Sequence, residues 1–566
     1  MAAIDYLRVL ADFNRDSAFD HPLSDITGRV ISASFSYGFD APGQLVAPPA
    51  TGTVVLDNAD GAFLPGQPGA LYAGLLQRDI LIKFKHTAEY ESVSLGVTLD
   101  GVPLILLRVI DIQIDPGQLG GRVVVLTLGD WHTELMSAIY DPPLTTNTAT
   151  GYAVVAPFVA GLLPLPYAGS YWVLGASVLD EDTILFSSIG NISGYPGQTT
   201  LEYVGDNIDR GQGVSLYSFI EEMCAAEMDG RFWLSFFTLP GYTDRPRYQY
   251  IARDSLAYYY NEALKSTFTA DVFLNTGNEY EYGRTICNQV EITMYPRRVG
   301  SAGTEIGRTT SPMLIPGVGL PGNKSSDDQS GGNTRTFTLR YRDPEYPDGT
   351  CTATTIITPV ASVDYTGNLE SDGSGGDYTG NLVVSVVNKT NAAEVTVSNT
   401  ALGDVYLTLL KIRGTPLTAR QPLTITSADA QSIHDYGLHR QSRTIAGVDD
   451  VELVQAYADN FVQTHKDPIA RFRRVSFEFP PEPDGDLYRQ SLFGVLRASA
   501  VRILDPWTED ETNARLQWIA GTQHVIDGGA RTWRTTWFLD DYLTNAPWLM
   551  GDNDLSVLDT STRLSF

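Results

Sequence analysis

The side chains that most often bind metals are few and poorly placed in this chain. His434 and His439 are five residues apart in a loop-like segment, which is unsuitable spacing for holding one metal ion. His465 comes at the end of an expected helix, where a cation interacts favourably with the helix dipole. The three cysteines, Cys224, Cys287 and Cys351, are far apart and form no C-x-x-C motif. Solvated or capping histidines and buried thiols therefore fit this pattern better than a metal site.

Nucleophiles and general bases show no better pattern. The chain lacks H-E-x-x-H, G-x-S-x-G and G-x-x-x-x-G-K-[ST]. Asp372-Gly-Ser-Gly-Gly376 resembles a serine-protease loop only superficially, because it lies between two Tyr-Thr-Gly-Asn copies and suits a turn. Paired carboxylates serve glycoside hydrolysis, but any pair can be chosen among 67 acidic residues. Asp57-Asn-Ala-Asp60-Gly61 is too short for a calcium loop. We expect no enzyme, no catalytic residue, no cofactor and no metal.

Composition indicates a large, mainly β protein. A chain of 566 residues is too long for one core and should divide into several domains. Tyr, Phe and Gly are plentiful and many segments alternate, as in strands. The net charge of −28 disfavours binding to nucleic acid. It suits either simple solubility or an acidic channel wall past which DNA slides.

Targeting segments are not evident. The N-terminus lacks a basic region followed by an apolar stretch, so we expect no signal peptide and synthesis in the cytoplasm. The most apolar run, residues 153–166, is interrupted by Pro157 and Pro164. A membrane-spanning helix needs roughly 20 apolar residues. We therefore read this run as core or a short helix and expect no stable membrane insertion.

Alternation predicts several strands. From Ile31 to Phe39, apolar residues alternate with Ser or Gly, which is typical of a half-buried strand. Further strands are expected at 53–56, 79–85, 109–114 and 123–128, the last two as a hairpin. Near the end, 518–526 and 532–539 flank Asp527-Gly-Gly529, a good hairpin turn.

Two helices stand out from their 3.6-residue period. In 215–227, Leu216, Phe219, Ile220, Met223 and Cys224 form one apolar face, with Ser215 as the expected N-cap. Glu227 extends this face, and we expect it to be partly buried and bonded to backbone amides or an Arg. The second helix spans about 451–465 and is capped by Asp449 or Asp450.

Five motifs follow one another in a characteristic order. They are Leu56-Asp-Asn-Ala-Asp-Gly-Ala-Phe63, Ala225-Ala-Glu-Met-Asp-Gly-Arg-Phe232, Asn288-Gln-Val-Glu-Ile-Thr293, Tyr406-Leu-Thr-Leu-Leu-Lys-Ile-Arg-Gly-Thr-Pro-Leu417 and Ser432-Ile-His-Asp-Tyr-Gly437. In this order the chain resembles the central tail-tip proteins of tailed bacteriophages, also called minor tail or baseplate-hub proteins. The resemblance covers about residues 25–540.

This resemblance implies a mainly β fold with α+β subdomains and two tail-tube-like β-barrels per chain. The expected divisions are a first barrel at 1–135; an α/β subdomain and the start of the second barrel at 136–295; a linker and inserted β domain at 296–430; and a helix with the completing β region at 431–566. Strands near 286–295 and those after 471 would build the second barrel. The Gly-rich segment 317–332 would lie outside the barrels.

The function implied by the resemblance is structural. Three copies would form a ring that joins the hexameric tail tube to the central tip or fibre and lets DNA pass during ejection. Expected partners are the distal tail protein, tail tube proteins, tape-measure protein and central tip or fibre proteins. The expected location is the tail tip of the virion, after assembly in the host cytoplasm. A carbohydrate-binding tail adhesin is the alternative, given aromatics such as Tyr258 to Tyr260 and Trp533, and a β-rich polysaccharide-cleaving enzyme is the third.

Overall fold

A computed structural model gives the fold of most of the chain. The described residues are 7–140 (except 17, 66–68, 88–89, 93–96, 100–101 and 116–121), 145–149, 153–154, 157, 175–179, 182–185, 200–204, 214–235 (except 229), 247–251, 266–282 (except 270–271 and 275), 286–318, 333–478 (except 347–348, 390 and 469), 487, 491, 500–504, 516–528 and 532–541. Most of the Gly-rich segment 317–332 and Tyr258 to Tyr260 lie outside these ranges.

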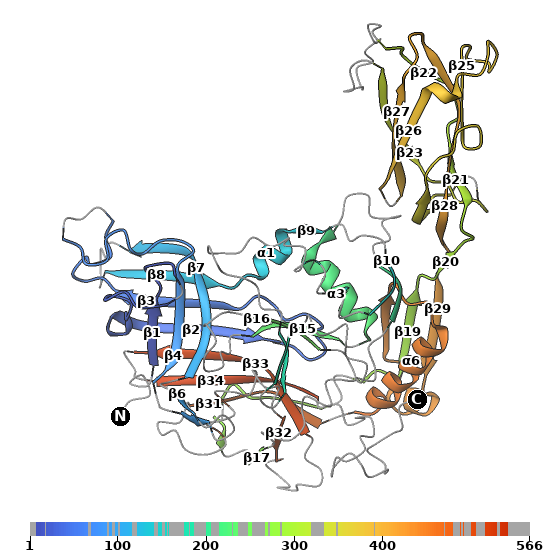
Figure 1. Ribbon diagram of the computed structural model, residues 1–566. Helices are drawn as coiled ribbons and strands as arrows, with labels where there is room; N and C mark the ends of the chain where they lie inside the picture. Colours follow the sequence, from blue (N-terminus) through green and yellow to red (C-terminus); the bar gives the residue numbers. More distant parts are fainter. Residues whose placement is uncertain are drawn as a thin grey trace.

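The main body is built on one 12-stranded sheet (Figure 1). Its strands, in spatial order, are β1 (Leu7–Ala11), β4 (Leu81–His86), β7 (Val102–Asp115), β8 (Val123–Gly129), β3 (Thr51–Asp57), β2 (Val30–Gly38), β33 (Leu516–Asp527), β34 (Thr532–Asp541), β31 (Ala470–Glu478) and β18 (Glu279–Tyr282). Two more strands, β17 (Ser266–Phe268) and β32 (Ala500–Ile503), join through β33. The mainly β prediction, the strands of the first 130 residues and the late hairpin are confirmed.

The two ends of the chain meet at the centre of this sheet. Strand β2 pairs antiparallel with β3 on one edge and with β33 on the other, from Ser32 opposite Asp527 to Gly38 opposite Gly521. Because β2 gives its second edge to β33, it cannot also close on β1. Among the described residues, no barrel closes. The two expected tail-tube-like β-barrels are therefore not closed in these residues, where one open sheet is shared by both ends of the chain.

A small helical layer lies beside the sheet. Helix α3 (Leu216–Ala226) is the clearest predicted helix, and Ser215 caps it by accepting a hydrogen bond from the Ser218 N–H. Phe219 lies in its buried face, and Glu227, at its C-cap, is fully buried. Neighbouring elements are α1 (His132–Ser137), β9 (Ile139–Tyr140), β14 (Val214–Ser215), β15 (Arg231–Ser235) and β16 (Arg247–Ile251). Further short strands are β5 (Tyr90–Ser92), β6 (Val97–Leu99), β10 (Thr145–Ala149), β11 (Gly175–Leu179), β12 (Asp182–Leu185) and β13 (Thr200–Val204).

A separate three-stranded sheet carries the second predicted helix. Strand β19 (Gln289–Met294) pairs with β29 (Leu423–Ala428) and β30 (Arg440–Ile445), not with the strands after 471 that we expected it to join. Helix α6 (Val451–His465) contacts β19 and β29, and Asp450 caps it through the Leu453 N–H. The short helix α5 (Ala430–Tyr436) connects β29 to β30. The predicted bounds and cap of α6 are confirmed.

Residues 297–419 form an arm that projects from the main body (Figure 1). The arm has its own hydrophobic core, which includes Ile306, Tyr341, Val395 and Leu410. Its strands are β20 (Arg297–Val299), β21 (Thr304–Arg308), β22 (Met313–Ile315), β23 (Thr334–Arg340), β24 (Thr352–Ile357), β25 (Tyr365–Asn368), β26 (Leu382–Asn388), β27 (Ala392–Asn399) and β28 (Val405–Ala419). Five of them pair with the long strand β28, while β23, β27 and β26 form a second sheet.

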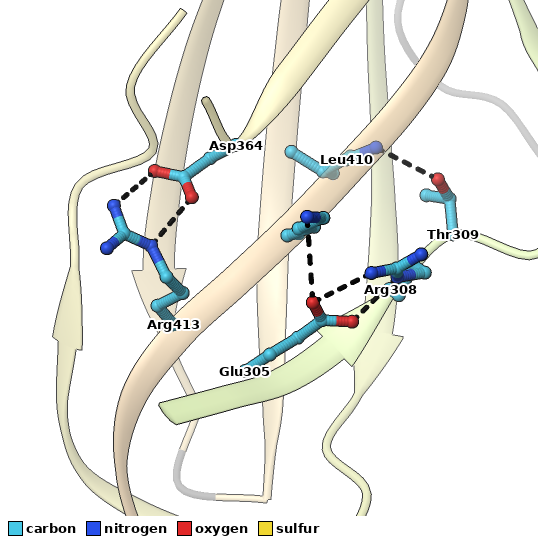
Figure 2. A network of polar contacts seen from close by, with 7 residues as sticks. Glu305, Arg308, Thr309, Asp364, Leu410 and Arg413 are labelled. Atoms are coloured by element: carbon cyan, nitrogen blue, oxygen red, sulfur yellow. Dashed lines mark hydrogen bonds and ion pairs between the residues drawn. The ribbon is translucent and has the colours of Figure 1, made fainter. Parts of the chain in front are cut away.

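Ion pairs across the strands of the arm fasten β28 to its neighbours (Figure 2). Both carboxylate oxygens of Asp364 accept bonds from the Arg413 guanidinium, at 2.6 and 2.7 Å. This hydrogen bond from Arg413 lowers the pKa of the Asp364 carboxyl. Glu305 accepts a bidentate pair from Arg308 of the same strand, β21, at 2.6 and 2.9 Å, and it lies 3.9 Å from Lys411 of β28. The backbone N–H of Leu410 donates to Thr309 Oγ1, so both sides of β28 are bound.

Candidate functional site

The long sheet buries one face and exposes the other. Phe35, Val54, Leu126 and Trp533 point into the main core from neighbouring strands. The opposite side chains are half-buried or exposed, and between β7 and β31 they form what we call the open face. Its members include Arg108, Asp111, Gln113 and Asp115 on β7; Val123, Val125 and Thr127 on β8; Thr51, Thr53, Val55 and Asp57 on β3; Ser32, Ser34 and Ser36 on β2; Gln523, Val525 and Asp527 on β33; Thr532 and Arg534 on β34; and Arg474 and Glu478 on β31.

The register aligns these side chains in rows that cross both halves of the chain. Side chains directly opposite on neighbouring strands lie on the same face of a sheet. One row runs from Asp111 through Thr127, Thr53 and Ser34, each opposite the next. It continues from Ser34 to Val525, Arg534 and Glu478. The open face is therefore one continuous surface, rich in small hydroxyl side chains.

Charge on the open face is predominantly negative. Five acidic residues lie on it in the described strands, namely Asp57, Asp111, Asp115, Asp527 and Glu478, against Arg108, Arg474 and Arg534. Arg108 is in addition paired with Glu134. Arg474 is also 3.8 Å from Glu279 on β18, which offsets its charge. A surface of this kind lacks the clustered Lys and Arg that hold phosphates. It can lie beside a polyanion without binding it.

Behind the open face, a buried histidine ties the two halves together. The Trp533 indole donates to His524 Nδ1 at 3.1 Å, and the Thr535 hydroxyl lies 3.0 Å from the same nitrogen. The His524 ring lies 4.8 Å from Phe35 of β2. Burial, together with the nearby His86, lowers the pKa of His524 to about 3. Burial also lowers the pKa of His86 to about 4, so both rings are neutral near pH 7.

A buried ion pair stabilises one end of the contact between the N-terminal and C-terminal strands of the sheet. Arg231 of β15 lies 3.2 Å from Asp540 of β34 and also donates to the Gln44 carbonyl in the β2–β3 loop. The Gly43 N–H donates to the same Asp540 oxygen at 3.0 Å. The Arg231 guanidinium also lies over the Phe39 ring. One arginine thus joins three segments that are far apart in sequence.

The histidines singled out in the sequence are not brought together. The side chain of His434 is 81% exposed and bonds Asp435, while His465 stacks on Phe461 and contacts the Phe461 carbonyl. In the part of the chain that the structure describes, no group of three or more His, Cys, Asp and Glu residues is arranged to hold a metal ion. The three cysteines are buried, as expected.

The two Asp-Gly segments are turns, as predicted. Gly373, Gly375 and Gly376 have positive φ, and the Ser374 N–H donates to Asp372 Oδ1. In the N-terminal motif, Asn58 Oδ1 accepts from the Phe63 N–H at 3.0 Å, and Gly61 has a φ of 72°. These contacts position Phe63 in the core rather than forming a ligand site.

The buried position of Trp533 removes one observation that favoured the adhesin alternative. We expected an exposed aromatic, but the ring is 1% exposed and bonds His524. Tyr258 to Tyr260 lie outside the described residues. None of the described helices is long and apolar enough to cross a membrane.

Sequence reasoning missed the open face as a unit. Each strand shows alternation on its own, but the rows depend on register and on β2 pairing with β33, almost 500 residues later. The run of Ser32, Ser34 and Ser36 was the available signal, because small hydroxyl residues alternate with large apolar ones there.

Comparison with known proteins gives matches among solved structures alone. No family model matches the chain, and no curated protein matches it. It is similar to a tail protein from Neisseria meningitidis MC58, at 8% identity over 94% of this chain and 96% of that chain, with a TM-score of 0.40. The 43 kDa tail protein of prophage MuSo2 from Shewanella oneidensis matches at 8% identity over 95% and 98%, with a TM-score of 0.41.

A third match is the prophage tail protein gp18 from Listeria monocytogenes EGD-e, at 9% identity over 94% of each chain, with a TM-score of 0.37. All three are named as tail proteins, two of them from prophages.

Proposed function

We propose that this chain is the structural hub of a phage tail tip. Three copies form a ring that joins the hexameric tail tube to the central tip or fibre, and DNA passes through the ring during ejection. The observation that carries this proposal is the open face, a continuous, polar and net acidic surface built from both ends of the chain. The ordered sequence motifs support the same reading.

The physical argument concerns transit of DNA. A wall of lysines and arginines would bind phosphates and hold the duplex. Hydroxyl and carboxylate side chains keep a layer of water and repel phosphates. Placed toward the lumen of a ring, the open face would let DNA slide past.

Symmetry gives a reason for three copies. Soluble oligomers usually close by rotational symmetry. The long sheet of each chain is built mainly from two groups of strands, β1 to β4 with β7 and β8, and β31 to β34. A trimer therefore presents six such groups, which can match a six-fold tube. The distal tail protein, tube proteins and tape-measure protein are the expected neighbours on one side, and tip or fibre proteins on the other.

Imaging of the assembled particle by cryo-electron microscopy tests the proposal. We expect a three-fold ring at the tail tip with the open face toward its lumen. A monomer at the tail periphery, or a lumen lined by Lys and Arg, would contradict it. The hub has no hydrolytic role in this proposal, so turnover of peptidoglycan or capsule by clean protein, abolished by one carboxylate substitution, would contradict that part.

A further inference from the structure

Strand β26, at one edge of the second sheet of the arm, lacks the residues that normally protect an edge strand from pairing. Strands at sheet edges normally carry charges or proline that prevent pairing with other chains. Strand β23, the other edge of the same sheet, carries Arg335 and Arg340. The seven residues of β26, Leu-Val-Val-Ser-Val-Val-Asn, include neither charge nor proline. Val383 and Val387 are 57% and 52% exposed.

The backbone of β26 has N–H and C=O groups on its outer side, away from β27, that can form hydrogen bonds with another strand. The Lys389 N–H donates to the Ala392 carbonyl and the Thr400 N–H to the Asn381 carbonyl, both toward β27. Antiparallel ladders alternate, so residues 383, 385 and 387 also bond toward β27. Val384 and Val386 therefore direct their N–H and C=O groups away from it. In the described part of the chain, those groups bond to no other segment.

The ends of β26 are held, which confines the available edge to its middle. The Leu382 carbonyl accepts from the Tyr365 hydroxyl at 3.3 Å. The Asn388 amide donates to the Ala353 carbonyl at 2.9 Å and its oxygen accepts from the Tyr341 hydroxyl. The strand is thus fixed in an extended form, ready to pair along Val383 to Val387.

The sequence of this middle segment is a palindrome. Val383-Val-Ser-Val-Val387 reads the same in both directions about Ser385. If two copies pair antiparallel about a two-fold axis at Ser385, Val384 of one strand lies opposite Val386 of the other, and they exchange backbone bonds. Val383 then lies opposite the other copy's Val387 on the exposed face. Every side chain meets an identical type.

Two-fold interfaces require self-complementarity of this kind, in which each residue meets the same type in the other copy. Lys389, which follows β26, is paired with Glu394 of β27 at 3.7 Å, so it adds no unpaired charge at this end of the edge.

We propose that β26 is a docking edge for the β26 of a second copy of this chain, paired antiparallel about Ser385. This contact is independent of the proposed ring. Added to a three-fold ring, it would join two rings into a hexamer; without a ring, it would give a dimer.

Sedimentation of the full chain over a range of concentrations tests this contact. The wild-type mass should double as concentration rises. In a V383K/V387K variant, each Lys lies opposite another Lys, and like charges opposite each other destabilise a ladder. We expect the dissociation constant to rise at least about tenfold, which corresponds to 1.4 kcal/mol.

A V383K/V387E variant is the matched control, because each Lys then faces a Glu of the other copy. It should pair again, and its pairing should weaken with salt. Both positions are exposed, so both variants should fold, as circular dichroism will report. Absence of doubling in the wild type, unchanged pairing of the Lys/Lys variant, or failure of the Lys/Glu variant to recover would each overturn the proposal. The mass at the lowest concentration, that of a trimer or that of a monomer, tests the proposed ring separately.

Discussion

Gly521 lies where the two ends of the chain cross, at a point that leaves no room for a side chain. A Cβ added there would be 2.2 Å from the Phe39 carbonyl oxygen, which belongs to backbone and cannot turn away. The adjacent Phe39 N–H donates to the Ala520 carbonyl at 2.9 Å. Close approach of β2 and β33 therefore depends on this glycine.

We predict that Gly521→Ala lowers the free energy of unfolding of the main body by about 1–3 kcal/mol, the usual range for overpacking. Chemical denaturation of both proteins measures the difference. Gly403→Ala is the matched control, since nothing lies within 4 Å of its added Cβ. Equal stability of the Gly521 variant and the wild type would show that the two strands can move apart.

The buried histidines should make stability depend on pH. Their folded pKa values, about 4 for His86 and about 3 for His524, lie below the ordinary value of 6.5. The unfolded chain therefore binds protons first as pH falls below 6.5, and unfolding becomes easier. We expect a loss of several kcal/mol between pH 7 and pH 4, since one pKa unit is about 1.4 kcal/mol.

Denaturation at pH 7 and pH 4.5 of the wild type and of His524→Gln checks this dependence. The variant should show a smaller loss between the two pH values, whatever its stability at pH 7. His434→Gln should behave like the wild type because its side chain is 81% exposed. An identical pH slope in all three proteins would remove the histidines as its cause.

At the scale of elements, local signals were enough where they act within a few residues. Ser215 and Asp450 were expected as helix caps and do accept bonds from Ser218 and Leu453. Turn chemistry likewise placed the late hairpin at Asp527, where β33 meets β34. Pairing between distant strands was not predictable, because alternation fixes which face is buried but not the neighbour. Strand β19 was therefore assigned to the wrong partners.

Helix α3 offers a direct test of the apolar face that the sequence predicted. Phe219 is 2% exposed and lies edge-on to Tyr140, with ring centroids 4.9 Å apart. We expect Phe219→Ala to destabilise the protein by about 3–5 kcal/mol, as for other buried phenylalanines. Thermal melting of this variant beside Glu221→Ala, on the exposed side of the helix, gives the measurement. A melting point within a degree of the wild type would contradict the role of Phe219 in the core.

At the scale of the whole molecule, the open face unites features that sequence reasoning could not connect. Ser34 and Val525 lie opposite each other although 491 positions separate them. The net charge of −28 left solubility and an acidic channel wall equally open. The register favours the second reading, because carboxylates and hydroxyls gather on one continuous surface. The arm, by contrast, keeps a core of its own and extends from the body.

The proposed role of the open face in DNA passage predicts that lysines placed on this face make the protein bind DNA. We choose Ser34, Thr127 and Gln523, which lie on this face but not opposite one another. The triple Lys variant changes the face from five acidic and three basic residues to five acidic and six basic residues. Because each phosphate contact releases counterions, the variant should bind duplex DNA at low salt and lose it steeply as salt rises. Gel-shift titrations at several salt concentrations measure this, and the wild type should not bind.

Lysines at Thr336, Thr338 and Ser398 on the arm add the same charge elsewhere and should have little effect. If the arm variant bound DNA as strongly as the open-face variant, net charge rather than the open face would govern DNA binding.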